Sequence, residues 1–470
     1  MSDHLTEQQR AAQSTSGLGG MRRSTFVKLG LIAPLAALPF ARSVAAAQGR
    51  GHGQGSQEWQ QVAHDLEATR TVRRAPSSLS IRWRQPIAGG LTGPALVVED
   101  AVIAASLGGE VAAFDLDTGR ERWRRVFPQA RYGSGESEVV LGFFGGCAAA
   151  AGRVLVASDR VRCLRLRDGA LLWEADPLRA PGADDYFWGA PVVAAGLVIV
   201  GSGAGSEATE TRGRVSAYDM HDGRLAWSTP TVPESGNGGG VLAPVSVDLQ
   251  RGAVFAGTGS PYLTQPGDNP GTCSVIEVAL RDGRLRWSDQ LHAGDTLGLD
   301  VNSAPVLTPR VIAVTAKDGV WAWRRDSRER AWHRKVTPAT PADGGPASPI
   351  NGPEGGPLAF DGKRLFALSN DGDQGSGVAA ALDPHTGEVR WQSALSGLTF
   401  AAPAVAGDAL CLSNVSGDLE VLNVDTGAVR GRVALGGPSA GAVSAARGRI
   451  LVGIGAEPFL PGGELICIGC

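Results

Sequence analysis

The feature that most constrains the fold is a degenerate repeat, in which an Asp-x-x-Thr-Gly turn precedes a tryptophan that lies four residues after the glycine. Complete copies are Asp115–Gly119 with Trp123 and Asp383–Gly387 with Trp391. Looser copies supply the remaining units, which end in Trp173, Trp227, Trp287 and Trp332, with Gly431 at the last tryptophan position and Trp83 standing without a preceding turn. Successive positions are 40 to 60 residues apart. Self-similarity of this kind indicates a repeat architecture.

Each unit reads as four short strands. In the unit that begins near Gly93 we expect strands at residues 95–98, 102–105, 111–116 and 121–125, separated by Gly- and Asp-containing turns. The 66 glycines fit many tight turns, because glycine adopts the positive φ that such turns need. We expect each tryptophan on an outer strand to cover the neighbouring unit, with its indole N–H bound to a carbonyl there.

Seven intervals between successive tryptophan positions run from Trp83 to Gly431. Residues 447–470 supply about three further strands. The segment Ser80–Gln85, which contains Trp83, would add the missing fourth strand. Pairing the two ends of the chain closes a ring and removes an exposed sheet edge. The sequence therefore predicts an all-β, eight-bladed β-propeller of four-stranded antiparallel blades over residues 78–470, preceded by an N-terminal arm at residues 48–77.

Residues 1–47 read as a leader and signal peptide. Arg22 and Arg23 precede an apolar stretch from Leu29 to Phe40, and Ala45–Ala47 fit a small-residue cleavage site. The paired arginines resemble the twin-arginine export signal. We expect an exported protein, periplasmic or extracellular, and an uncleaved membrane anchor is the alternative.

Composition narrows the classes of partner. The net charge is −3 and the basic residues are scattered, so nucleic acid is not expected as a ligand. After residue 50 no apolar run reaches the length of about 18 residues that spans a bilayer. Of the six cysteines only Cys467 and Cys470 lie close in sequence, and whether they pair is left open.

Five stretches resemble the quinoprotein dehydrogenases, eight-bladed propellers that hold pyrroloquinoline quinone (PQQ) at their axis. Besides the repeats, they are Trp59 to Arg70, Arg212–Val215, Thr258–Pro261 with Gly267–Asn269, and Ala316–Gly319. The arm and the Thr258 stretch are most similar to the alcohol and polyvinyl-alcohol dehydrogenase branch. The repeats alone also fit the cofactor-free propeller of the outer-membrane assembly machinery.

The resemblance implies a set of site residues. In the family a Ca²⁺ or lanthanide ion binds PQQ, and a carboxylate takes the proton of the substrate hydroxyl. The metal-ligand positions fall on Glu207, Ser260 and Asp300, and Lys317 matches the cation that contacts the quinone oxygens. Asp300 would also be the catalytic base, with Asp295 as the second candidate.

The chain departs from the family pattern at four positions. Ser260 stands where the family has asparagine, and Gly298 stands where it has the catalytic carboxylate. Leu242 replaces the tryptophan that stacks on PQQ, and Cys147 stands alone where an adjacent cysteine pair forms the other face. A leucine can cover a planar ring, but with less contact than an indole.

Two functions therefore stay open. The first is an exported oxidoreductase that oxidises a small or polymeric alcohol at a PQQ and metal site and passes electrons to an external acceptor. The second is a propeller that kept the scaffold without the cofactor and acts as a binding or assembly platform. A third class, a lyase or hydrolase using the same axis, has no Ser-His-Asp, phosphate-loop or His-x-x-x-His motif to support it.

Overall fold

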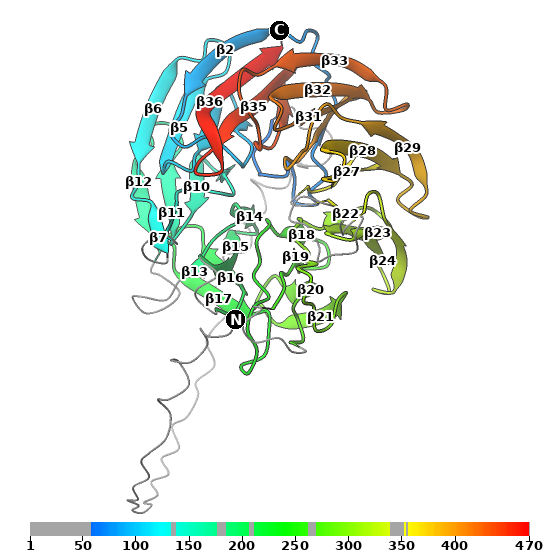
Figure 1. Ribbon diagram of the computed structural model, residues 1–470. Coiled ribbons are helices and arrows are strands. Elements are labelled where there is room, and N and C mark those ends of the chain that lie inside the picture. Colours follow the sequence, from blue (N-terminus) through cyan, green and yellow to red (C-terminus); the bar gives the residue numbers. More distant parts are fainter. Residues whose placement is uncertain are drawn as a thin grey trace, which may run out of the picture. The chain divides into compact units, whose positions relative to one another are not determined.

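The computed structural model describes residues 58–132, 138–175, 185–205, 211–261, 269–338, 352–353 and 356–469. These residues form strands, turns and loops without any helix, and eight small antiparallel sheets follow one another around a ring (Figure 1). The predicted eight-bladed β-propeller is confirmed. No helix in this part of the chain offers the long apolar stretch that a membrane crossing requires.

Seven blades are built from strands in chain order. Blade 1 has β3 (Leu96–Val98), β4 (Ala101–Ala105), β5 (Glu110–Asp115) and β6 (Glu121–Val126), and blade 2 has β9 (Cys147–Ala150), β10 (Arg153–Ala157), β11 (Val161–Arg165) and β12 (Leu171–Glu174). Blade 3 has β14 (Val192–Ala194), β15 (Leu197–Ala204), β16 (Arg214–Asp219) and β17 (Leu225–Pro230), with β13 (Asp185–Tyr186) added to β15. Blade 4 has β18 (Ser246–Asp248), β19 (Ala253–Gly257), β20 (Ser274–Ala279) and β21 (Leu285–Gln290).

The second half repeats this plan. Blade 5 has β22 (Val306–Leu307), β23 (Val311–Ala316), β24 (Gly319–Arg324) and β25 (Arg330–Arg334), and blade 6 has β26 (Ala359–Phe360), β27 (Leu365–Asp371), β28 (Ser376–Leu382) and β29 (Val389–Ala394). Blade 7 has β30 (Ala404–Ala406), β31 (Ala409–Ser413), β32 (Asp418–Asn423) and β33 (Val429–Ala434), and a separate hairpin joins β7 (Ala130–Tyr132) to β8 (Val139–Leu141).

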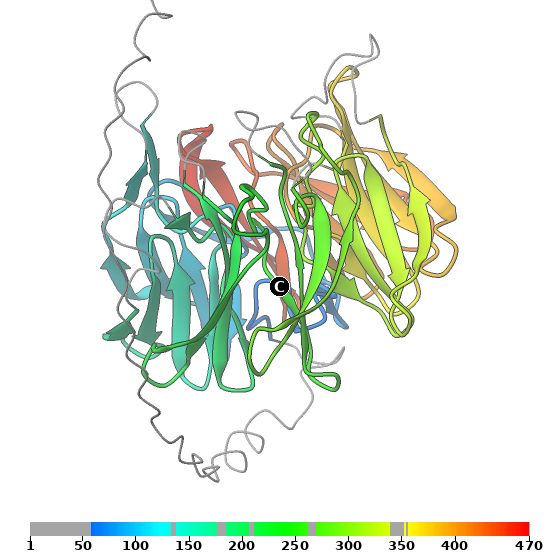
Figure 2. The ribbon, with the colours of Figure 1, turned by 90° about the horizontal axis from the view of Figure 1, so that it is seen from below.

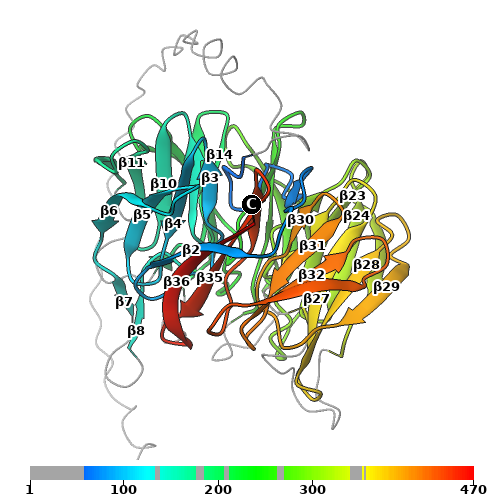
Figure 3. The same ribbon diagram turned by 90° about the horizontal axis from the view of Figure 1, so that it is seen from above.

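The eighth blade joins the two ends of the described chain. It contains β34 (Ser444–Ala446), β35 (Arg449–Ala456) and β36 (Leu460–Gly469), and its fourth strand is β2 (Ile81–Pro86). β2 pairs antiparallel with β36, with Trp83 opposite Cys467, and the two lie side by side in Figure 3. The predicted closure is therefore confirmed. All five cysteines of the described part are buried and free.

The repeated tryptophan docks each blade on the next one. Trp83 donates its indole N–H to the Leu116 carbonyl at 2.9 Å, and its ring covers Gly119 in the turn of blade 1. Five more tryptophans donate in the same way to the carbonyl three residues before the next repeat glycine, namely Trp123, Trp173, Trp227, Trp332 and Trp391. The predicted indole hydrogen bond is confirmed at these positions.

The two irregular repeats have local reasons. Gly431 faces blade 8, where the chain ends replace the turn that a tryptophan would cover, and a side chain at Gly431 would meet Leu79. In blade 5 Arg328 takes the positive φ of 64° that glycine has elsewhere. Trp287 of blade 4 then packs edge-on against Trp323, with ring centroids 5.9 Å apart.

The arm Trp59–Val72 runs inside the ring, where it is coloured blue (Figure 1). It exchanges backbone hydrogen bonds with the inner strand of blade 1, since Trp59 and Val97 each donate to the other at 2.9 and 3.0 Å. Further inner-strand N–H groups then donate to carbonyls along the arm, namely Ala149 to Gln60, Val247 to Leu66, Leu307 to Glu67, Phe360 to Thr69 and Val405 to Arg70. In blade 3 Val193 N–H instead binds the Gln61 side chain at 3.2 Å. One short segment thus contacts seven blades in order.

The ring has two faces with different loops. The fourth strand of each blade and the first strand of the next meet at one face, which we call the connection face. The turns between second and third strands lie at the same face, because neighbouring strands are antiparallel. In Figure 2 the red β35–β36 hairpin lies at this face and the blue arm toward the opposite one. The loop 291–305 and the turn at residues 317–318 therefore share the connection face.

Candidate functional site

Asp300 and Lys317 lie next to each other on the connection face. Asp300 precedes β22, Lys317 follows β23, and the Lys317 backbone N–H donates to the Asp300 carbonyl at 3.2 Å. Lys317 is buried, with 9% of its surface exposed. Burial raises the pKa of the Asp300 carboxyl, and the Lys317 charge acts in the opposite direction. The two residues predicted as base and quinone contact are thus electrostatic neighbours.

Ser260 connects the loops of blade 4 to this pair. Its backbone N–H donates to Asp300 Oδ1, and Asn302 Nδ2 donates to Asp300 Oδ2 at 3.4 Å. The Ser260 hydroxyl donates instead to Asp295 Oδ2 at 2.9 Å. Ser260 therefore orients two carboxylates.

Asp295 has a different environment from Asp300. It is buried, and its oxygens accept the backbone N–H groups of Leu297 at 3.0 Å and Leu299 at 2.9 Å in addition to the Ser260 hydroxyl. The Cys273 thiol lies 3.4 Å from Ser260 Oγ and 3.6 Å from Asp295 Oδ2, a neighbour that no sequence pattern indicated. These bonds hold the loop that carries Asp300, and the role of either residue as a base remains a prediction.

Leu242 lies beside glycines of two blades. A Cβ atom built on Gly203 or on Gly240 would lie 3.3 Å from Leu242 Cδ2. Gly240 in turn accepts the Gly259 N–H at 2.8 Å, directly before Ser260. Leu242 is therefore linked by close contacts to the Ser260 and Asp300 segment, and its predicted contact with a cofactor ring remains a prediction.

The metal part of the predicted site is incomplete in the described residues. Glu207 lies outside them. Among those that are described, no group of three His, Cys, Asp or Glu side chains is arranged to hold a metal ion. Ser260 points an N–H at Asp300, and an N–H cannot bind a cation. Lys317 can bind an anionic group, whereas a metal ion at Asp300 would need further oxygen ligands such as Glu207.

A second polar cluster lies one residue beyond Lys317, around the Asp318 carboxylate. Trp321 Nε1 donates to Asp318 Oδ1 at 2.9 Å, while His292 Nε2 and His333 Nε2 lie 3.4 and 3.5 Å from Asp318 Oδ2. The Trp321 and His333 rings stack with centroids 3.9 Å apart. His292 and His333 belong to different blades, so their meeting at Asp318 depends on how the blades pack.

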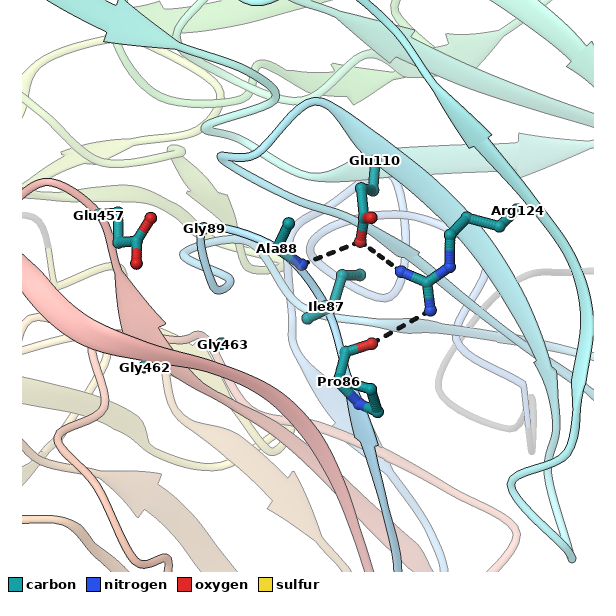
Figure 4. Close-up of a pocket in the computed structure, with 9 residues that line it drawn as sticks. All are labelled: Pro86, Ile87, Ala88, Gly89, Glu110, Arg124, Glu457, Gly462 and Gly463. Atoms are coloured by element: carbon teal, nitrogen blue, oxygen red, sulfur yellow. Dashed lines mark hydrogen bonds and ion pairs between the residues drawn. The ribbon is translucent and has the colours of Figure 1, made fainter.

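A separate pocket of about 440 Å³ opens between blades 8 and 1 (Figure 4). Glu110 accepts the Ala88 N–H at 2.9 Å and binds Arg124, which also donates to the Pro86 carbonyl at 3.1 Å. Glu457 and the glycines Gly462 and Gly463 line the other side. None of the predicted site residues lines this pocket.

Comparison with known proteins places the chain in a family. The PQQ_2 family model, described as outer membrane protein assembly factor BamB, matches residues 51–142, 107–341 and 310–466. Quinohemoprotein alcohol dehydrogenase ADH IIB of Pseudomonas putida is 26% identical over 316 residues, which is 58% of this chain and 45% of that protein. Polyvinylalcohol dehydrogenase of Sphingopyxis sp. (strain 113P3) is 25% identical over 376 residues, 67% of this chain and 54% of that protein. The chain thus spans about half the length of these curated relatives.

The fold agrees with that placement. A europium-containing methanol dehydrogenase superposes with a TM-score of 0.75 at 16% identity, over 91% of this chain and 100% of that chain. At this identity the likeness shows the fold alone. Since the family model covers most of the sequence, the chain belongs to the PQQ-repeat β-propeller family, and its relatives include quinoprotein alcohol dehydrogenases.

Proposed function

We propose that this protein is an exported quinoprotein-type oxidoreductase that oxidises an alcohol on the connection face of the propeller. The observation that carries the proposal is the placement of Asp300 beside Lys317, with a carboxyl whose pKa burial raises above its usual range. A base with a raised pKa binds a proton more tightly than an ordinary carboxylate, and perturbed groups of this kind gather at functional sites.

Each residue has a role in this proposal. Bound PQQ would supply the two-electron acceptor that alcohol oxidation needs. Lys317 would bind the quinone oxygens through a charge-assisted hydrogen bond. Asp300 would accept the hydroxyl proton of the alcohol, and the Ser260 N–H and Asn302 amide orient its carboxylate. The Lys317 charge opposes the rise in the Asp300 pKa that burial causes.

The metal ion is part of the same proposal. Ca²⁺ or a lanthanide would take Asp300 and Glu207 as oxygen ligands, with Ser260 as a weaker third. The Ser260 hydroxyl is held by Asp295 in the described structure, so it would have to exchange that bond for the metal. Two relatives are named for alcohol and polyvinyl alcohol, so a small or polymeric alcohol is the proposed substrate class, with an external electron acceptor.

The test is dye-linked alcohol oxidation after reconstitution with PQQ and either Ca²⁺ or a lanthanide. Asp300→Asn keeps the shape of the side chain and removes the base, so turnover should fall by about 10²- to 10⁴-fold. Asp326→Asn, which removes a carboxylate from an exposed turn of blade 5, is the matched control and should leave turnover unchanged. Wild-type protein without bound quinone absorbance or activity in either metal would refute the proposal.

The alternative is a cofactor-free propeller that acts as a binding or assembly scaffold. The description of the matching family model, an assembly factor, favours it. So does Leu242 in place of the tryptophan that the family pattern has there. Under this alternative wild type binds no quinone, and Asp300→Asn and Lys317→Ala change neither quinone binding nor partner binding.

A further inference from the structure

We propose that Asp318 is a positioning residue for Lys317, and that His292 and His333, which share one oxygen of its carboxylate, make the environment of Lys317 respond to pH. The inference rests on the proposed function in assigning Lys317 a ligand. The placement of Lys317 is tested independently of any ligand below.

The Asp318 carboxylate is the centre of the cluster. Its Oδ1 takes the Trp321 indole N–H at 2.9 Å, and its Oδ2 faces both imidazoles at 3.4 and 3.5 Å. Its side chain is 12% exposed, against 19% for His292 and 27% for His333. A largely buried carboxylate that is contacted from three elements holds its backbone in place, because moving it would leave a desolvated charge without partners.

The turn that carries Lys317 is fixed on both sides of that carboxylate. The Lys317 N–H is bound to Asp300, and the Lys317 carbonyl lies so close to Gly352 of the next blade that a Cβ there would meet it at 2.0 Å. On the other side Gly319 has a φ of 144°, and a Cβ there would lie 2.9 Å from His333 Nε2. The Lys317 backbone therefore cannot shift without disturbing the imidazole cluster.

The choice of lysine at this position is unusual for this chain. Only four of its 44 basic residues are lysines, namely Lys28, Lys317, Lys335 and Lys363. Lys335 and Lys363 are exposed, so Lys317 is the buried lysine of the described residues. An ammonium is a compact charge on a flexible stem, and it needs its backbone fixed if it is to bind at a defined point.

The charges that face the cluster give the direction of the pH response. Burial tends to raise the pKa of Asp318, but the Trp321 hydrogen bond and the neighbouring His292 and His333 outweigh burial and keep it below the usual value. Burial lowers the pKa of His333, and the Lys335 and His292 charges lower it further while Asp318 opposes them. Arg330 lies over the Trp321 ring, 5.3 Å from its centroid, and stays charged throughout.

Near neutral pH the His333 imidazole is therefore uncharged in our proposal, and Asp318 carries its negative charge one residue after Lys317. As pH falls below the lowered pKa of His333, a positive charge appears beside that carboxylate. The net potential at Lys317 then becomes more positive. An anionic ligand should bind more tightly at pH 5.5 than at pH 7.5, by a few-fold at the separations within one turn.

Lysine-selective NMR tests the pH response of the Lys317 environment directly in the full-length protein without cofactor. With only four lysines, protein labelled with ¹³C-lysine gives few signals, and Lys317→Arg identifies the one from Lys317. The Lys317 signal should move between pH 5 and 7.5 with the midpoint of an imidazole. In the His292→Gln, His333→Gln double variant that movement should vanish. A Lys317 signal that does not move in wild type, or that moves equally in the double variant, overturns the pH response.

A binding experiment separates positioning from charge alone. Equilibrium dialysis with PQQ measures the affinity of wild type and Asp318→Asn at pH 7. Removing a negative charge beside Lys317 would tighten anion binding if charge alone mattered, whereas loss of positioning should weaken it by at least 5-fold. Tighter or unchanged binding overturns the positioning role, and Asp326→Asn is the matched control for the charge change. If wild type binds no PQQ, the proposed function fails, and the effect of Asp318→Asn on the Lys317 signal then decides the positioning role by itself.

Discussion

The contact between a repeat tryptophan and the next repeat glycine gives a sharp prediction for Gly119→Ala. Gly119 has a φ of 71°, and a Cβ there would lie 2.7 Å from two ring atoms of Trp83. The variant therefore has two costs. A left-handed alanine costs about 1–2 kcal/mol, and forcing a methyl into a packed contact costs about 1–3 kcal/mol.

Gly196→Ala separates these costs. Gly196 has a similar φ of 79° in the turn between β14 and β15, but a Cβ there would have nothing within 4 Å. Gly196→Ala should therefore show the backbone cost alone. The two variants should differ by about 1–3 kcal/mol in the free energy of unfolding.

Calorimetric melting of the two variants is the assay. An unfolding entropy of about 2.1 cal/mol/K per residue over about 410 residues gives about 0.9 kcal/mol/K, so Gly119→Ala should melt about 1–3 °C below Gly196→Ala. In a Trp83→Leu background the difference in melting temperature between the two variants should disappear, because the steric cost of Gly119→Ala comes from the Trp83 ring. Equal melting temperatures of the two single variants would refute the docking explanation.

Three further predictions concern other parts of the chain. Burial raises the pKa of Asp300, so the ionisation of Asp300 opposes folding as pH rises through that pKa. Asp300→Asn should therefore have a higher melting temperature than wild type at pH 7 and lose this advantage below pH about 4. A lower melting temperature of the variant at pH 7 would contradict this prediction. Trp391→Phe removes the 2.9 Å hydrogen bond to the Val424 carbonyl and should cost about 0.5–1.5 kcal/mol in a denaturant titration, and no loss would show that the bond is not formed. Deleting residues 447–470 strips β2 of its partner strand and should abolish the cooperative melt, whereas an unchanged melt would argue against closure through blade 8.

The blades could be predicted because their signal is local and repeated. A turn glycine and a tryptophan four residues later indicate the third and fourth strands of one blade. Trp83, which has no preceding turn, correctly indicated the blade that the two ends of the chain form together. The site could be predicted only in part. Asp300 and Lys317 were predicted as site residues through resemblance at single positions; the structure places them next to each other, and their roles stay predictions.

Other contacts had no signal in the sequence. His292 and His333 meet Asp318 from different blades, and the Cys273 thiol reaches Ser260 across a strand, so their proximity depends on how the blades pack. The sequence also offered no physical reason for the irregular turn of blade 5. Arg328 replaces glycine there, and its Nε binds Glu277 of blade 4 at 2.8 Å, a bond that helps to hold the positive φ.

The route of the arm has a consequence for synthesis. The ribosome makes Trp59–Val72 before any blade, yet the partners of this segment are spread from Val97 to Val405. For most of translation the arm therefore has carbonyl groups whose partners do not yet exist. Contacts so distant in sequence close slowly, because loop-closure entropy must be overcome before they form. The nascent chain consequently has a long period in which the arm is exposed, and a factor that protects the arm until blade 7 emerges would raise the yield of folded protein.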